Sequence, residues 1–162
     1  MNNCNFSRYI ITVVIQHALL LFDLCVNSFS SFARENTTNL LILYIIQDFA
    51  IIVAFTLLLL SFFSTYIFQV GLIQVLYVKY RFTLILCITY LIMSITLHTW
   101  HIKVEWLHSS KYHWTNGFHI MYSIHRTVAV LYYCFYKRAS LTIADPRFYE
   151  GSFWVQKQFN LP

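Results

Sequence analysis

The stretch FAIIVAFTLLLLSFFSTYIFQVGLIQVLYV occupies residues 49–78 and contains no Asp, Glu, Lys or Arg. A run of 30 uncharged residues is longer than the roughly 20 that a helix needs to cross the hydrocarbon of a bilayer. A second uncharged run covers residues 82–102. The two runs predict an all-α, polytopic membrane protein, and the other segments can be interpreted around them.

The composition of the whole chain indicates the same class. Hydrophobic residues make up 59% of the 162 residues and charged residues 10%, against about 45–50% and about 25% in soluble domains. Three glycines and two prolines are too few for a Gly-rich phosphate loop. The net charge of +5 comes from scattered bases, whereas a nucleic-acid surface needs them clustered. We therefore expect the lipid bilayer as a partner, with no nucleic acid and no cofactor.

Hydropathy divides the chain into a transmembrane part, residues 1–136, and a tail, residues 137–162. We predict a bundle of four transmembrane helices at about residues 9–29, 40–63, 82–102 and 118–136. The second helix could continue to Phe68. The first segment could instead be a cleaved secretory signal, but Asp23 and Asn27 interrupt the region before its small-residue site. We favour a retained helix.

The distribution of Lys and Arg predicts the orientation. With four spans, one side of the membrane holds seven bases and the other three, and basic residues are enriched on the cytosolic side. Both termini are therefore expected in the cytosol. Asn36 lies in an Asn-x-Thr sequon in a short lumenal loop, where glycosylation is possible.

The tail carries the features of an amphipathic helix at about residues 145–159. Asp145 is suited to an N-cap and Pro146 to the first helical position. Large apolar side chains then recur through the segment, and those expected to dock are Phe148, Trp154 and Phe159. We interpret the segment as a helix lying on the cytosolic leaflet, or alternatively docking on a partner protein.

Three ionisable residues lie inside the predicted spans, where charge is costly and often functional. Asp48 and Arg126 each lie about nine residues from the lumenal start of a span, or roughly 13 Å deep, and Asp23 reaches a similar level. Equal depth permits an Asp–Arg–Asp cluster, with hydrogen-bond partners at Gln47, His98 and His125. One hypothesis is a proton or ion pathway. We favour the other, in which the cluster fixes helix packing through bonds worth roughly 0.6–2 kcal/mol each.

Other chemistries have weaker signals. His98 and His101 share a helix face, but Glu105 is the only acid near them, so we do not predict a metal site. The four cysteines lie far apart and predict no disulfide framework, although Cys134 has a juxtamembrane position that permits palmitoylation. No nucleophile, base and acid can be assembled on one side of the membrane, so we expect no enzymatic activity.

Several short motifs resemble those of the transmembrane protein 138 family. They include Asp23-Leu24-Cys25-Val26-Asn27-Ser28-Phe29-Ser30, Ile45-Ile46-Gln47-Asp48, Phe68-Gln69 with Gly71-Leu72, Leu97-His98 with Trp100, Trp114-Thr115-Asn116-Gly117, Arg126 with Ala129-Val130-Leu131-Tyr132, Phe135-Tyr136-Lys137-Arg138, and Asp145-Pro146-Arg147-Phe148-Tyr149 with Trp154, Lys157 and Phe159. The resemblance extends along essentially the whole chain, apart from the extreme termini and the lumenal loops.

The resemblance implies a small four-span membrane protein needed to assemble the cilium. It suggests a role in vesicle traffic to the ciliary base and transition zone, a location in vesicle or vacuole membranes and at the cilium, and ciliary or trafficking membrane proteins as partners. It implies no catalytic residues. The alternative hypothesis is a small transporter or channel subunit that uses the intramembrane Asp, Arg and His side chains.

Overall fold

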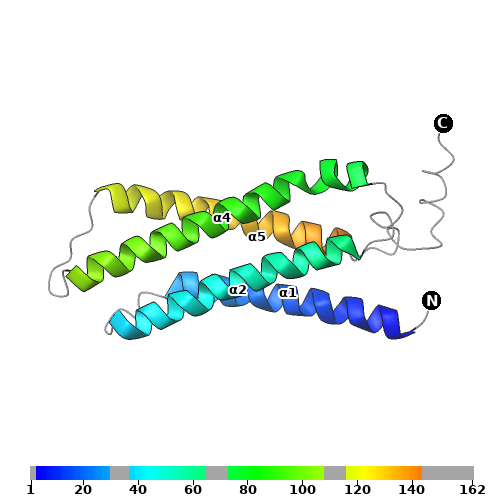
Figure 1. The fold of residues 1–162 in the computed structure, drawn as a ribbon, viewed down its shortest axis with the longest axis horizontal. Coiled ribbons are helices and arrows are strands. Elements are labelled where there is room, and N and C mark those ends of the chain that lie inside the picture. Colours follow the sequence, from blue (N-terminus) through cyan, green and yellow to red (C-terminus); the bar gives the residue numbers. More distant parts are fainter. Residues whose placement is uncertain (1–2, 30–36, 65–72, 108–115, 144–162) are drawn as a thin grey trace.

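The computed structural model describes residues 3–29, 37–64, 73–107 and 116–143. Within these ranges every residue except Ser64 is helical, which confirms the predicted all-α class. The four helices are α1 (Asn3–Phe29), α2 (Thr37–Phe63), α4 (Ile73–Leu107) and α5 (Asn116–Ile143). Figure 1 shows them extended along the long axis of the molecule, with each helix running opposite to the one before it in the chain.

Three of these helices are long and apolar enough to cross a membrane. The qualifying segments are Ile10–Phe29, Thr38–Phe63 and Tyr80–Val104, and they coincide with the first three predicted spans. The shortest has 20 residues, or about 30 Å of helix, which matches the hydrocarbon thickness of a bilayer. α5 has 28 residues and packs beside α4; its role as a fourth span is considered with the proposed function.

The helix ends differ from the hydropathy boundaries. α2 ends at Phe63, and residues 65–68 of the possible extension lie outside the described residues. At this end the backbone amide of Ser64 donates to the Leu60 carbonyl at 3.0 Å. α4 begins nine residues before the predicted third span, and α5 continues seven residues past Tyr136. Hydropathy marks the lipid-facing length of a helix, whereas backbone hydrogen bonding continues into the polar flanks.

The bundle has an apolar exterior and a mixed interior. Large exposed aliphatic side chains occur on every helix, for example Ile11, Ile45, Ile92 and Ile120. The interior combines aliphatic residues with tyrosines, and Tyr90, Tyr132 and Tyr136 are among the largest fully buried side chains. An outward-facing apolar surface suits acyl chains, so the forces that hold the helices together must come from packing and interior hydrogen bonds.

Candidate functional site

The candidate site is built on a polar stripe along one face of α1. Gln16, Asp23 and Asn27 follow one another at spacings of seven and four residues, which places them on the same helix face. Their side chains are 1%, 2% and 6% exposed. Because a buried polar group without a partner is costly, this stripe requires hydrogen bonds from the neighbouring helices.

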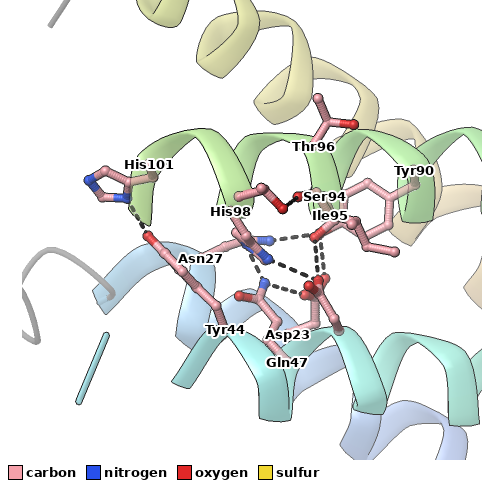
Figure 2. Close-up of polar contacts among 12 residues, drawn as sticks. Asp23, Asn27, Tyr44, Gln47, Tyr90, Ser94, Ile95, Thr96, His98 and His101 are labelled. Carbon is pink, nitrogen blue, oxygen red and sulfur yellow. Dashed lines mark hydrogen bonds and ion pairs between the residues drawn. The ribbon is translucent and has the colours of Figure 1, made fainter. Parts of the chain in front are cut away.

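Asp23 lies at the centre of a hydrogen-bond network that joins all four helices. Its Oδ1 accepts from Gln47 Nε2 of α2 at 2.6 Å. Its Oδ2 accepts from the hydroxyls of Tyr90 in α4 and Tyr133 in α5, both at 2.7 Å. Figure 2 shows the bonds from α2 and α4 converging on this carboxyl group. We refer to Asp23, Asn27, Gln47, Tyr90 and Tyr133 as the central network.

The two amides determine the direction of the bonds in the central network. Asn27 Nδ2 donates to the hydroxyls of Tyr90 and Tyr133 at 2.8 and 2.9 Å, and Gln47 Nε2 also donates to Asn27 Oδ1 at 3.2 Å. Each tyrosine hydroxyl therefore accepts a hydrogen bond from Asn27 and donates one to Asp23. All three groups around Asp23 act as donors, so both carboxyl oxygens are used as acceptors.

Asp48 belongs to a second cluster, between α2 and α4. Its Oδ1 lies 2.9 Å from His98 Nδ1 and accepts from the Ser94 hydroxyl at 3.1 Å. The His98 ring stacks on Tyr44, with centroids 4.0 Å apart, and the Tyr44 hydroxyl lies 2.7 Å from His101 Nδ1. Together these contacts join α2 to α4, and Figure 2 shows Tyr44 of α2 bonded to His101 of α4.

Arg126 binds neither aspartate. Its guanidinium donates to the backbone carbonyl of Asn27 and to the Tyr122 hydroxyl at 2.7 Å, and it lies over the Tyr122 ring at 4.8 Å. Among the residues that the structure describes, the basic side chain in contact with Asp48 is His98. The sequence predicted that Asp23, Asp48 and Arg126 lie at a similar depth in the membrane. The three side chains nevertheless have different partners, because each points in a different direction about the axis of its helix.

His125 is buried beside the two clusters and takes part in neither of them through a hydrogen bond. Its side chain is 1% exposed, yet neither ring nitrogen has a hydrogen-bond partner among the described residues. The ring stacks on Tyr90 with centroids 5.1 Å apart and meets His98 edge to face at 6.5 Å. Two unpaired nitrogens in an apolar stack destabilise the fold by about 1–3 kcal/mol for each unsatisfied group.

A third set of polar contacts lies farther along the bundle. Gln16 Nε2 donates to the Ser61 hydroxyl of α2 at 3.3 Å, and Gln16 Oε1 accepts from Ser140 of α5. In the same region the Tyr136 hydroxyl donates to the Ala54 carbonyl at 2.7 Å. Each polar residue on the α1 stripe therefore bonds to at least one other helix.

Comparison with known proteins gives a family. The family model described as Transmembrane protein 138 matches residues 40–158. The chain is 44% identical to transmembrane protein 138 of Mus musculus, 43% to that of Danio rerio and 41% to that of Xenopus tropicalis, over 94% of each chain. The chain belongs to the transmembrane protein 138 family. No solved structure matches it.

The family identification confirms the resemblance found in the sequence motifs, and it places the site partly inside the matched range. Gln47, Tyr90 and Tyr133 of the central network lie within the residues matched by the transmembrane protein 138 model, whereas Asp23 and Asn27 precede them.

The polar side chains of the candidate site form hydrogen bonds between helices. In the described helices no three His, Cys, Asp or Glu side chains lie close enough together to hold a metal ion. Cys25, Cys87 and Cys134 are free thiols, and Cys134 is exposed. Three predicted features of this member of the transmembrane protein 138 family fall outside the described residues: the sequon at Asn36, the helix at residues 145–159, and its docking side chains Phe148, Trp154 and Phe159.

Sequence reasoning placed some of these residues correctly in contact and missed others. Gln47 and His98 were expected as hydrogen-bond partners of the acids, and each bonds to one of them. Tyr90 and Tyr133 were not anticipated, because tyrosine in an apolar run resembles an ordinary aromatic core residue. The regular spacing of polar residues on α1 was the available signal, since it predicts hydroxyl or amide partners on the facing helices.

Proposed function

We propose that the chain is a non-enzymatic multi-pass membrane protein required for cilium assembly, acting in vesicle traffic to the ciliary base and transition zone. Membership of the transmembrane protein 138 family along nearly the whole chain carries this proposal. Its site of action would be vesicle or vacuole membranes and the cilium, with trafficking membrane proteins as partners. The central network supports a structural role, because Asp23, Gln47, Tyr90 and Tyr133 bond to one another between helices.

The proposal includes a fourth span formed by α5 and places both termini in the cytosol. Between residues 117 and 136 the only Lys, Arg, Asp or Glu is Arg126, and its charge is held by a carbonyl and a tyrosine inside the bundle. The outer face of α5 carries exposed Ile124, Val130 and Leu131. A helix with an apolar outer face and an inward-facing arginine is suited to lipid.

The tail provides the test of the trafficking role. We expect simultaneous Phe148→Ser, Trp154→Ser and Phe159→Ser substitutions to release the predicted amphipathic helix from membrane or partner. In ciliated cells that lack the endogenous protein, the tagged triple variant should then fail to reach the ciliary base and fail to restore cilia. Its stability in detergent should equal that of the wild type, because these residues lie in the tail, after the predicted transmembrane part at residues 1–136.

The matched control changes three polar residues in or directly after the same segment, Gln156, Gln158 and Asn160, to Ser. This control should localise and rescue normally. Normal localisation of the apolar triple variant would contradict the tail hypothesis, and absence of the wild-type protein from the ciliary base would contradict the ciliary role itself.

A second candidate function is transport of protons or ions, and His125 is the observation that favours it. A buried imidazole with two unpaired nitrogens, close to His98, is a group that could exchange protons. Purified protein in liposomes that contain a pH-sensitive dye separates the two functions. We expect no proton flux above that of empty liposomes. A flux that His125→Phe abolishes would replace the trafficking proposal with a transporter.

A further inference from the structure

We propose that α4 and α5 form a binding site for an acidic glycerophospholipid on the outer surface of the bundle, with Arg81 and Arg138 holding the headgroup phosphate. The site lies at the end of the bundle where α4 begins and α5 ends. It depends on α5 being a membrane span, as proposed above, but not on a role in cilia.

The packing of two phenylalanines fixes the register of this helix pair. The rings of Phe82 in α4 and Phe135 in α5 meet edge to face with centroids 4.9 Å apart. Because the helices are antiparallel, the residue before Phe82 and the residues after Phe135 lead towards the same end. Arg81 is about 1.5 Å and Arg138 about 4.5 Å along the helix axes from that contact, so the two arginines lie within one helical turn of each other.

The two arginines also project to the same side of the α4–α5 seam. Successive residues rotate by about 100° around a helix. Seen from the end of the bundle that holds the arginines, one step from Phe82 to Arg81 turns the side chain by about 100°, and three steps from Phe135 to Arg138 turn it by about 300°, which equals about 60° in the opposite sense. Because Phe82 and Phe135 face each other, these opposite rotations turn Arg81 and Arg138 to the same side of the seam. One step forward from each phenylalanine turns the side chain to the opposite side of the seam and leads to Thr83 and Tyr136. Both are buried in the bundle, so the arginines are on the outside.

An apolar strip continues from the arginines along the seam. By the same rotation, Ile85, Leu131 and Cys134 lie on the outer side, and all three are exposed, as is Phe82. We call these four residues the seam strip. A lipid whose headgroup lies at the two arginines would place an acyl chain along the strip. A soluble anion would use only the polar end of the site.

The charge around the arginines is unbalanced. Arg81, Lys137 and Arg138 are all exposed, and in the part of the chain that the structure describes none of them has an ion-pair partner. Of the acids in the described helices, Asp23 of α1 and Asp48 of α2 are bonded in the interior, and Glu105 lies near the opposite end of α4 in the sequence. Guanidinium groups bind phosphate oxygens in a bidentate manner, and basic clusters next to a span attract anionic lipids.

Native mass spectrometry of the full-length protein in detergent can test the site, with dioctanoyl phosphatidylserine and dioctanoyl phosphatidylcholine as probes. We expect the wild type to bind phosphatidylserine about tenfold more tightly, given two basic contacts to the headgroup. The double variant R81Q/R138Q should lose this preference to within about twofold. The matched control K103Q, which removes an exposed base near the opposite end of α4, should retain it.

Two further measurements keep the outcomes distinct. R81K/R138K preserves the charge but not the bidentate geometry, and it should bind phosphatidylserine more weakly than the wild type but better than R81Q/R138Q. Inorganic phosphate at millimolar concentration should not displace the lipid, because it cannot use the seam strip. Equal binding of the two lipids by the wild type, an unchanged preference in R81Q/R138Q, or displacement by phosphate would overturn the proposal.

Discussion

Replacement of Asp23 by Asn tests whether the central network holds the four helices together. The two side chains have nearly the same shape, but the amide nitrogen is a donor where the network uses an acceptor. If the amide oxygen keeps the bond from Gln47, the nitrogen faces Tyr90 and Tyr133. Those hydroxyls already accept from Asn27, so their own protons lose their acceptor.

The expected cost follows from the number of bonds lost. Interhelical hydrogen bonds in membrane proteins contribute about 0.6 kcal/mol on average and up to about 1.7 kcal/mol. The loss of two bonds therefore lowers the free energy of unfolding by about 1–3 kcal/mol. The variant with both Tyr90→Phe and Tyr133→Phe removes the same two donors and should be destabilised to a similar extent.

Cys87 provides a reporter of unfolding for this experiment. It lies in the core and is 3% exposed, so a maleimide dye reaches it only when the bundle opens. With Cys4, Cys25 and Cys134 replaced by Ser, labelling of Cys87 across a titration with sodium dodecyl sulfate gives an unfolding curve. Asp23→Asn should shift that curve to lower detergent fraction.

The matched control is Thr96→Val. The Thr96 hydroxyl is exposed and donates within its own helix, to the Ile92 carbonyl at 2.7 Å, so its loss should leave the unfolding curve in place. If Asp23→Asn unfolds at the same detergent fraction as the wild type, the central network does not stabilise the bundle. If Thr96→Val shifts the curve as far as Asp23→Asn, the effect does not depend on interhelical bonds.

Three further predictions use the same assay or a simple topology test. His125→Phe should raise the free energy of unfolding, by about 1 kcal/mol or more, because it removes two unsatisfied nitrogens but keeps the ring stack; a destabilised variant would show that the nitrogens have partners. Asp48→Asn and Arg126→Gln should be additive, whereas Asp48→Asn and His98→Phe should couple by about 0.5–3 kcal/mol; coupling of Asp48 with Arg126 would contradict the partners described above. Tags at both termini should be cleaved by protease added outside sealed vesicles that expose the cytosolic face, and protection of one tag alone would exclude four spans.

The sequence predicted the helices far better than their contacts. Apolar runs and their lengths located three spans, because the cost of placing charge in hydrocarbon is large and depends on position along the helix alone. The number of residues from the lumenal start of each span likewise predicted that Asp48 and Arg126 lie at the same depth. Which of them would touch depends on rotation about each helix axis, which equal depth does not specify. Asp48 therefore turned out to bond to His98, which was expected only as an accessory partner.

The interior tyrosines illustrate a second limit. A tyrosine in an apolar run satisfies the hydropathy pattern whether its hydroxyl reaches the interface or bonds inside the bundle. Only the position of an acceptor distinguishes the two, and for Tyr90 and Tyr133 that acceptor is Asp23, 67 and 110 residues away in the chain. Such a contact is set by the tertiary arrangement and has no local signature.

The polar stripe on α1 has a consequence for biosynthesis. Gln16 and Asp23 emerge from the ribosome early, but their α5 partners are Ser140 and Tyr133, made 124 and 110 residues later. Until then α1 carries polar groups into the membrane without their final bonds, each at a cost in free energy. The first helix should therefore remain close to the translocon, or be held by an insertion chaperone, until almost the whole chain has been synthesised. Ribosome-bound chains truncated before residue 133 should crosslink to that machinery through α1, whereas full-length chains should be released from it.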